Sequence, residues 1–285
     1  MKKLNLAYLI LLASLFACNN ASNNSENKGT VPNGQTNTQP LDTVTRLGDL
    51  KTAKSAIFKA PNGKFYTITP DTSQYFEEDK TMSSNKSLNS ESSNQPCDGN
   101  EFDGSDRKAA KLSVSDASVD DNETLEKIIG GLMPDDEISS KITSTDETSN
   151  RISDEEHNYK FKAWIYTFKR QGDEDYHVII GTTDNIKTAK FLNAEISGLP
   201  AQGSTYYTTL FNARKQFYDF FGWGENSCEA KSYTKDYMKN PIEVTITGSL
   251  FFDKFHYEKK SEIGPSWARG DSYWEIHPIT SIVFN

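Results

Sequence analysis

The order of apolar patterns over residues 157–285 constrains the fold of this chain more than any other feature. Alternating apolar residues predict three strands, at 159–168, 176–180 and 190–196. Apolar residues at helical spacing over 205–221 predict a helix, and alternation returns at 242–250 and 273–283. This is the order of a five-stranded OB-like barrel, with one helix between strands three and four. A generic α+β sandwich has a similar element count and is the alternative.

Two residues should modify the last two strands. Gly248 predicts a bulge or bend, because glycine inside a strand often marks one. Pro278 predicts an edge position or a break, since proline cannot donate a ladder hydrogen bond. The fold class is therefore mainly β, a β-rich α+β chain with two irregular positions.

A small hairpin is predicted upstream of this barrel. The apolar runs 56–60 and 64–68 flank Pro61-Asn62-Gly63, and Asn-Gly between two such runs is a strong hairpin signal. An isolated hairpin is marginally stable in water, so it either packs against another part of the chain or stays loose.

An acidic segment lies between the hairpin and the barrel. Residues 97–156 carry 6 basic and 17 acidic side chains, whereas residues 157–285 carry 15 of each. Its sequence predicts irregular structure, apart from one short amphipathic stretch at residues 122–132. The predicted organisation is a signal peptide (1–17), a flexible Asn/Ser tether (18–45), a hairpin segment (46–81), a low-complexity linker (82–96), an acidic extension packing on the barrel (97–156) and the barrel (157–285).

The N-terminus has the features of an export signal. Basic Lys2-Lys3 precedes an apolar run from Leu4 to Leu15, which is too short for a stable transmembrane helix. Ala17-Cys18 then resembles a bacterial lipobox, in which the thiol is lipidated and Cys18 becomes the first mature residue. A plain secretory signal with a chance cysteine is the alternative. A lipoprotein of this kind carries palmitate and other acyl chains, and several chains together anchor it stably.

The anchor places the chain in the cell envelope. Asn19 follows Cys18, where many Gram-negative lipoproteins retained in the inner membrane have aspartate. By that analogy we expect the outer membrane, with no preference for either leaflet. The membrane, reached through the lipid anchor, is thus the first predicted partner.

Two cysteines remain if Cys18 carries lipid. Cys97 and Cys228 form an even pair in a chain that enters an oxidising compartment, which predicts one disulfide. Two free, buried thiols are the alternative. The chain has no CxxC motif and no cysteine-rich metal site.

Several motifs in the barrel half resemble a functionally uncharacterised family of exported bacterial proteins. The family pattern is DxDYHLVL…AEIP…ARxQF…VTGxxFFDxxHG…ELHPV, matched here by residues 175–180, 194–196, 213–217, 244–256 and 275–278. With Cys97 and residues 107–117 as an entry segment, the resemblance covers residues 97–283. It implies an exported location and no particular activity. The chain departs from the pattern at residues 197–200, where the family has a cysteine, and again at residues 257–260. With that family cysteine missing here, the resemblance implies that Cys228 takes its place as the partner of Cys97.

The histidines are the residues best suited to chemistry. Asp175 and His177 lie two apart on a strand and share a face, as do Glu275 and His277. Such pairs either form a buried hydrogen-bond network or hold a divalent metal. The metal candidates are His177, His256, His277 and Glu275, with zinc as the ion and Asp253 and Glu275 as catalytic carboxylates if the protein is an enzyme. We expect the structural role, and hence no cofactor.

Two functions follow from these observations. The first is a lipid-anchored binding module for a protein, a glycan or a single-stranded nucleic acid, with Trp164, Arg214 and Trp274 as candidate ligand contacts. The second is a metal-dependent hydrolase, with nucleic acid as a candidate substrate, that uses His177, His277, Glu275 and Asp253. The net charge of −9 and the acidic middle argue against duplex DNA as a partner. The sequence has no P-loop, dinucleotide fingerprint or GxSxG elbow.

Overall fold

The computed structural model describes residues 41–47, 55–70, 100–223 and 236–285. These residues belong to one unit, which spans residues 40–285. Cys18, Cys97 and Cys228 lie outside the described residues, as do the predicted signal peptide and the linker 82–96. Lipidation and the disulfide therefore stay predictions.

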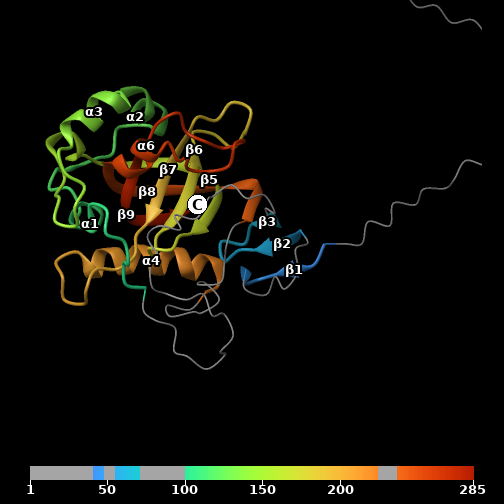
Figure 1. The fold of residues 1–285 in the computed structure, drawn as a ribbon. Helices are drawn as coiled ribbons and strands as arrows, with labels where there is room; N and C mark the ends of the chain where they lie inside the picture. The colour runs from blue at the N-terminus through green and yellow to red at the C-terminus, as the bar shows by residue number, and fades with distance from the viewer. Residues whose placement is uncertain (1–40, 48–54, 71–99, 224–235) are drawn as a thin grey trace, which may run out of the picture. The chain divides into compact units, whose positions relative to one another are not determined.

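Five strands close into a barrel in the predicted order (Figure 1). The strands β5 (Asn158–Arg170), β6 (Tyr176–Gly181) and β7 (Phe191–Ile196) precede helix α4 (Tyr207–Phe221). The strands β8 (Asp236–Phe252) and β9 (Trp274–Phe284) follow it. Neighbours pair antiparallel except β7 and β9, which are parallel, and β8 also pairs with β5 to close the barrel. The mainly β, OB-like barrel is confirmed, and the sandwich is not formed.

Aromatic side chains join α4 to the barrel core. The helix runs beneath the strands in Figure 1 and buries Ala213, Phe217 and Phe221 on one face. The ring centroid of Phe217 lies 5.1 Å from that of Phe168 and 5.3 Å from that of Tyr176. The apolar stripe predicted at helical spacing thus closes one end of the barrel.

The two irregular positions lie where they were predicted. The register between β8 and β9 shifts on both sides of Gly248. A Cβ at this position would lie 2.8 Å from the carbonyl oxygen of Pro278, so the close approach of the strands requires glycine. Pairing of β9 with β7 ends at Ile276, which leaves Pro278 beyond that ladder. The predicted bulge is confirmed, and β9 runs through Pro278 without a break, in a part of the strand that pairs with β8 alone, which is the predicted edge position.

The predicted hairpin is present and extends the sheet. β2 (Ala56–Lys59) and β3 (Phe65–Pro70) pair antiparallel around a turn in which Gly63 has φ 79°. β3 also pairs with β8, and β1 (Thr43–Val44) adds a parallel strand to β2. The side chain of Phe58 is fully buried, with its ring 5.8 Å from Phe220 and 5.9 Å from Phe221 of α4. The hairpin therefore packs on the barrel rather than staying loose.

The acidic segment contains more regular structure than its composition predicts. It forms α1 (Lys108–Lys111), β4 (Val119–Asp120), α2 (Leu125–Gly131), α3 (Asp135–Lys141) and the 3-10 turn η2 (Ser153–Glu155). Outside this segment, the short helix α6 (Lys254–Lys259) lies between β8 and β9. The predicted amphipathic stretch corresponds to α2, whereas α3 was not predicted. Acidic residues in the first turn of α3 stabilise the helix through its dipole. Near the C-terminal end of α3, Lys254 Nζ donates to Ser139 O at 3.0 Å. Within the part of the chain that the structure describes, no helix combines the length and apolar content needed to cross a bilayer.

Candidate functional site

Polar side chains gather on the outer face of three neighbouring barrel strands. In β6, Tyr176 and Val178 belong to the core, so Asp175 and His177 face the opposite way. The same alternation holds in β7 and β9, whose core residues include Ala194 and Ile276. The outward-facing polar residues are Asp175, His177, Asn193, Glu195, Ser197, Glu275 and His277.

The strand register brings these side chains into contact. His177 pairs with Glu195 across β6 and β7, and Asn193 pairs with Glu275 across β7 and β9. His177 Nε2 lies 2.9 Å from Glu195 Oε1. Asn193 Nδ2 donates to Glu195 Oε1 at 3.0 Å and to Glu275 Oε2 at 2.5 Å. Cross-strand neighbours thus link three strands through one carboxylate, Glu195.

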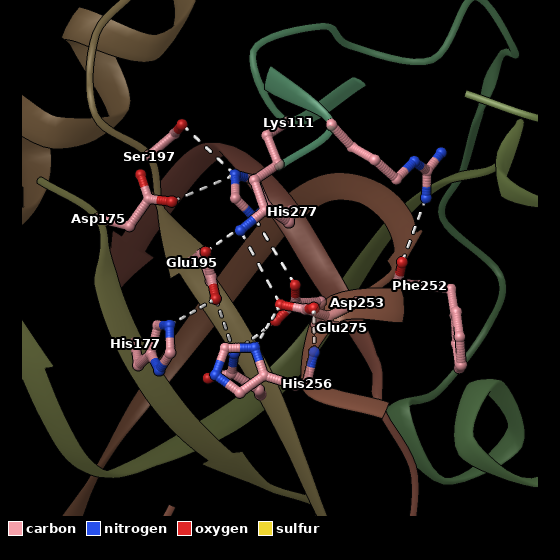
Figure 2. A network of polar contacts seen from close by, with 12 residues as sticks. Lys111, Asp175, His177, Glu195, Ser197, Phe252, Asp253, His256, Glu275 and His277 are labelled. Atoms are coloured by element: carbon pink, nitrogen blue, oxygen red, sulfur yellow. Dashed lines mark hydrogen bonds and ion pairs between the residues drawn. The ribbon is translucent and has the colours of Figure 1, made fainter. Parts of the chain in front are cut away.

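His277 lies at the centre of this face, as Figure 2 shows. Its Nδ1 lies 2.7 Å from Glu195 Oε2 and 3.7 Å from Glu275 Oε1. Its Nε2 lies 3.7 Å from Asp175 Oδ2 and 3.5 Å from Ser197 Oγ. The other oxygen of Asp175 accepts from Gly198 N at 2.5 Å, which fixes the orientation of that carboxyl. One imidazole is therefore surrounded by three carboxyl groups.

A second pair joins the group from the end of β8. Asp253 accepts at 2.9 Å from the backbone of His256 and lies 2.8 Å from its Nδ1. Lys111 Nζ of α1 is 3.9 Å from the same carboxylate, and the rings of His256 and His177 are 5.9 Å apart. We call the seven residues of this group the histidine–carboxylate cluster: Asp175, His177, Glu195, Asp253, His256, Glu275 and His277.

Residues 100–111 cover the cluster. Phe102 N donates to Leu199 O at 2.9 Å, and Leu199 N donates to Asn100 O at 2.6 Å. Gly198 allows this approach, because a Cβ there would lie 2.8 Å from Phe102 Cα. Arg107 then holds Glu155 through two hydrogen bonds of 2.6 and 2.7 Å, with both side chains fully buried. Arg107 also donates to Phe252 O at the end of β8 at 3.2 Å, so the covering segment is bonded to the barrel domain near both of its ends.

The cover leaves little of the cluster in contact with solvent. Its four carboxylate residues and His277 are 0 % exposed. The side chain of His256 is the most accessible of the seven at 20 % exposed. Solvent therefore meets the cluster on the His256 side.

Burial and neighbouring charges shift the pKa values of the cluster in opposite directions. Burial raises the pKa of Asp175 well above its usual range, and the carboxylates of Asp173 and Glu195 add to this rise. Burial likewise raises the pKa of Glu275, with contributions from Glu195 and Asp253. Burial also opposes the charge of Glu195, but His177 and His277 outweigh it and hold the pKa of that carboxyl well below its usual range. Glu195 is thus the carboxylate that stays ionised between two imidazoles.

The pair at the end of β8 favours its charged form. Burial opposes the charge of His256, but the Asp253 carboxylate outweighs it and raises the pKa of His256 to about 9. Burial also opposes the charge of Lys111, yet Asp253 and Glu195 hold the pKa of that ammonium well above its usual range. Two cations therefore lie beside the carboxylates at neutral pH.

The structure brings together some predicted site residues and separates others. His177, His256, His277, Asp253 and Glu275 all belong to the cluster. The candidate ligand contacts Trp164, Arg214 and Trp274 lie elsewhere, and only Trp164 is half-buried on the outer face of β5.

Arg214 and Trp274 have structural contacts. Arg214 is 1 % exposed and donates to Ser197 O at 2.8 Å and to the Tyr218 hydroxyl at 2.9 Å. Trp274 is also 1 % exposed and donates to Met133 O at 2.8 Å, although it borders a hollow of about 620 Å³. Both side chains therefore support neighbouring segments, and their assignment as ligand contacts stays a prediction.

Sequence reasoning did not assign Glu195, the carboxylate that contacts both His177 and His277. Glu195 is a charged residue inside the apolar run 191–196, and a buried charge of this kind usually has a polar partner. That signal marks Glu195 as important. Its two imidazole partners could not be identified without the register of β6, β7 and β9.

A second feature suited to ligands lies next to the cluster along β7. A hollow of about 610 Å³ is bordered by the α2–α3 turn, the start of β7 and the connection between β8 and β9. We call it the β7 hollow. Its lining includes the aromatic residues Phe191 and Tyr257 and the charged residues Asp135, Asp136, Lys190, Arg269 and Asp271.

Fold and site together define an OB-type barrel with a covered histidine–carboxylate cluster on its outer face. Comparison with protein-family models, curated proteins and solved structures found no match to this chain.

Proposed function

We propose that this chain is an exported, lipid-anchored binding module that holds a small oligosaccharide in the β7 hollow. The position of the hollow carries this proposal. OB barrels bind oligonucleotides and oligosaccharides with strands two and three and with the loop between strands four and five. The β7 hollow combines the start of the third barrel strand with that loop, and its volume falls within the range of small-ligand sites.

The lining favours a neutral sugar over a phosphate-bearing ligand. Three aspartates face two basic residues, and both basic side chains already form ion pairs, Lys190 with Glu126 and Arg269 with Glu262. Nucleic acids need a surplus of basic groups to neutralise phosphate. Carboxylates accept from sugar hydroxyls, and the rings of Phe191 and Tyr257 offer apolar area for the opposite face of a sugar.

The export signal and the family resemblance agree with this role. The proposed lipid on Cys18 and the Asn/Ser tether would hold the barrel near the envelope surface, where glycans are abundant. We further propose that the chain belongs to the exported family that it resembles. Support comes from the cluster, since each of its seven residues belongs to one of the motifs that carry the resemblance.

The alternative proposal, a metal-dependent hydrolase, draws support from the same convergence. The cluster contains all the residues that this hypothesis needs, including His177, Asp253 and Glu275. A substrate would have to reach carboxylates that are 0 % exposed beneath residues 100–111. The open β7 hollow therefore supports binding better than the covered cluster supports hydrolysis.

A glycan array probed with the full-length chain in detergent tests the binding proposal. We expect one class of neutral oligosaccharide to be retained, and calorimetry with that sugar should show at least about ten-fold weaker binding for Asp271→Ala, because each charged hydrogen bond contributes roughly 1.5–3 kcal/mol. Asp219→Ala is the matched control, since Asp219 is an exposed aspartate on α4. An array with no retained sugar, or equal affinities for both variants, would refute the proposal.

A further inference from the structure

Four buried atoms around His277 lack hydrogen-bond partners among the described residues. They are Asp175 Oδ2, Glu195 Oε2, Glu275 Oε1 and His277 Nδ1. All four residues are 0 % exposed. A buried polar atom without a partner is costly, so a group of four around one imidazole ring calls for an explanation.

The contacts of these atoms are close without being hydrogen bonds. Glu195 Oε2 lies 2.7 Å and Glu275 Oε1 lies 3.7 Å from His277 Nδ1, yet none of the three atoms has hydrogen-bond geometry. Asp175, Glu195 and His277 each present one ligand atom within 4.8 Å of the others. Figure 2 shows the three carboxyl groups directed toward the same imidazole from three strands. Ligands of one tetrahedral zinc ion lie about 3.4 Å apart. Asp175 is nearest to Nε2 of His277, whereas Glu195 and Glu275 are nearest to Nδ1, so one ion can join all four residues only when the imidazole and the carboxyl groups turn toward one point.

The excess of buried carboxyl groups also supports a bound cation. The cluster contains four fully buried carboxyl groups, and the basic side chains beside them are those of Lys111, His177, His256 and His277. Lys111 and His256 both approach Asp253, and His177 approaches Glu195, so His277 is the imidazole that Asp175, Glu195 and Glu275 share. Buried carboxylates in proteins are usually paired or bound to a metal.

We propose that Asp175, Glu195, Glu275 and His277 bind one divalent cation, zinc or manganese, as a structural ion. One imidazole and three carboxylates form a donor set suited to these ions. The ion would join β6, β7 and β9 beneath the covering segment. It goes beyond the proposed sugar binding, which uses the separate β7 hollow, and its ligand set differs from the sequence-based set of His177, His256, His277 and Glu275.

Surrounding residues already orient this donor set. Gly198 N holds Oδ1 of Asp175, and Asn193 Nδ2 holds Oε2 of Glu275, so each carboxyl group directs its other oxygen toward His277. His177 holds Oε1 of Glu195 in the same way. Hydrogen bonds of this kind typically orient the ligands of metal sites. Each carboxylate is therefore held by one oxygen and has the other available for an ion.

The test uses the full-length chain in detergent, refolded with zinc, manganese, magnesium or calcium and then freed of excess ion. Elemental analysis should find one zinc or manganese per chain, with a higher unfolding temperature than after refolding with a chelator. Asp175→Asn and Glu275→Gln preserve side-chain size, and each should weaken zinc binding at least about ten-fold. Asp106→Asn is the matched control, because Asp106 is a buried carboxyl outside the ligand set and should leave binding unchanged.

Two outcomes would overturn the proposal. One is wild-type chain that takes up no cation under any refolding condition. The other is zinc retained equally by both ligand variants, which would place the ion elsewhere. X-ray absorption spectroscopy on the zinc-loaded wild type identifies the ligands without relying on variants that must fold. We expect one nitrogen and three oxygen neighbours around the zinc ion, and a coordination shell without imidazole contradicts the assignment. No sugar enters these measurements, so a failure to bind metal leaves the proposed sugar binding unaffected. A glycan array that retains no sugar likewise leaves the metal site unaffected.

Discussion

His256 shows how one ion pair can make folding depend on pH. The Asp253 carboxylate raises the pKa of this imidazole from 6.5 to about 9 despite its burial. Because the folded pKa lies above the unfolded one, the stabilisation is fully present below pH 6.5 and is lost as the pH rises toward 9. The pKa of Asp253 is lowered, so its own contribution is present above its unfolded value of 3.8 and is lost on acidification.

We therefore expect His256→Gln to destabilise the chain at pH 6 by roughly 3 kcal/mol and much less at pH 10, since one unit of pKa shift corresponds to about 1.4 kcal/mol. Urea unfolding of both proteins at the two pH values measures this difference. NMR titration of the histidine rings, assigned with the variant, gives the pKa directly. A His256 midpoint at its ordinary value of 6.5, with equal destabilisation at both pH values, would contradict the pairing.

The sequence predicted the β2–β3 hairpin without showing whether it packs on the barrel. The contribution of this packing to stability can be measured through Phe58. Phe58 on β2 is fully buried against α4, whereas Phe65 on β3 is 58 % exposed. Phe58→Ala should cost about 3–5 kcal/mol, because it removes a buried ring and leaves a cavity. Phe65→Ala is the matched control and should change stability by less than about 0.5 kcal/mol. Urea unfolding compares the two, and similar small effects would mean that the hairpin does not stabilise the barrel.

Elements could be predicted from the sequence to the extent that local pattern determines them. The alternation in β5 to β9, the helical stripe of α4, the Asn-Gly turn and the bend at Gly248 are each encoded within a few residues. Pairing between distant segments is not encoded in this way. The docking of β3 on β8 and the parallel pairing of β7 with β9 depend on tertiary packing, so the partners of Glu195 could not be read from the sequence. Helix α3 was not predicted because its seven residues, of which one is a large apolar residue, carry little apolar periodicity.

The acidic extension changes which surface of the whole barrel is available. An OB barrel commonly binds ligands on the outer face of strands two and three. Here residues 100–111 cover that face, and the buried pair of Arg107 and Glu155 fastens the cover. The face is thereby converted into an interior that can accommodate charged groups. Ligands are left with the edge of the same face, where the β7 hollow lies beside the start of β7.

Attachment of the whole molecule to the membrane depends on one atom, the Cys18 sulfur, according to the lipobox prediction. Cys18→Ser should abolish incorporation of labelled palmitate and move the protein from the membrane fraction to the soluble fraction of cells, because the remaining signal peptide can direct export but supplies no acyl chain. Cys97→Ser and Cys228→Ser are matched controls that should keep both the label and the membrane fraction. Label retained by Cys18→Ser would show that another residue is acylated. Loss of label in all three variants would instead indicate that the cysteines affect export or folding, and the anchor would have to be sought elsewhere.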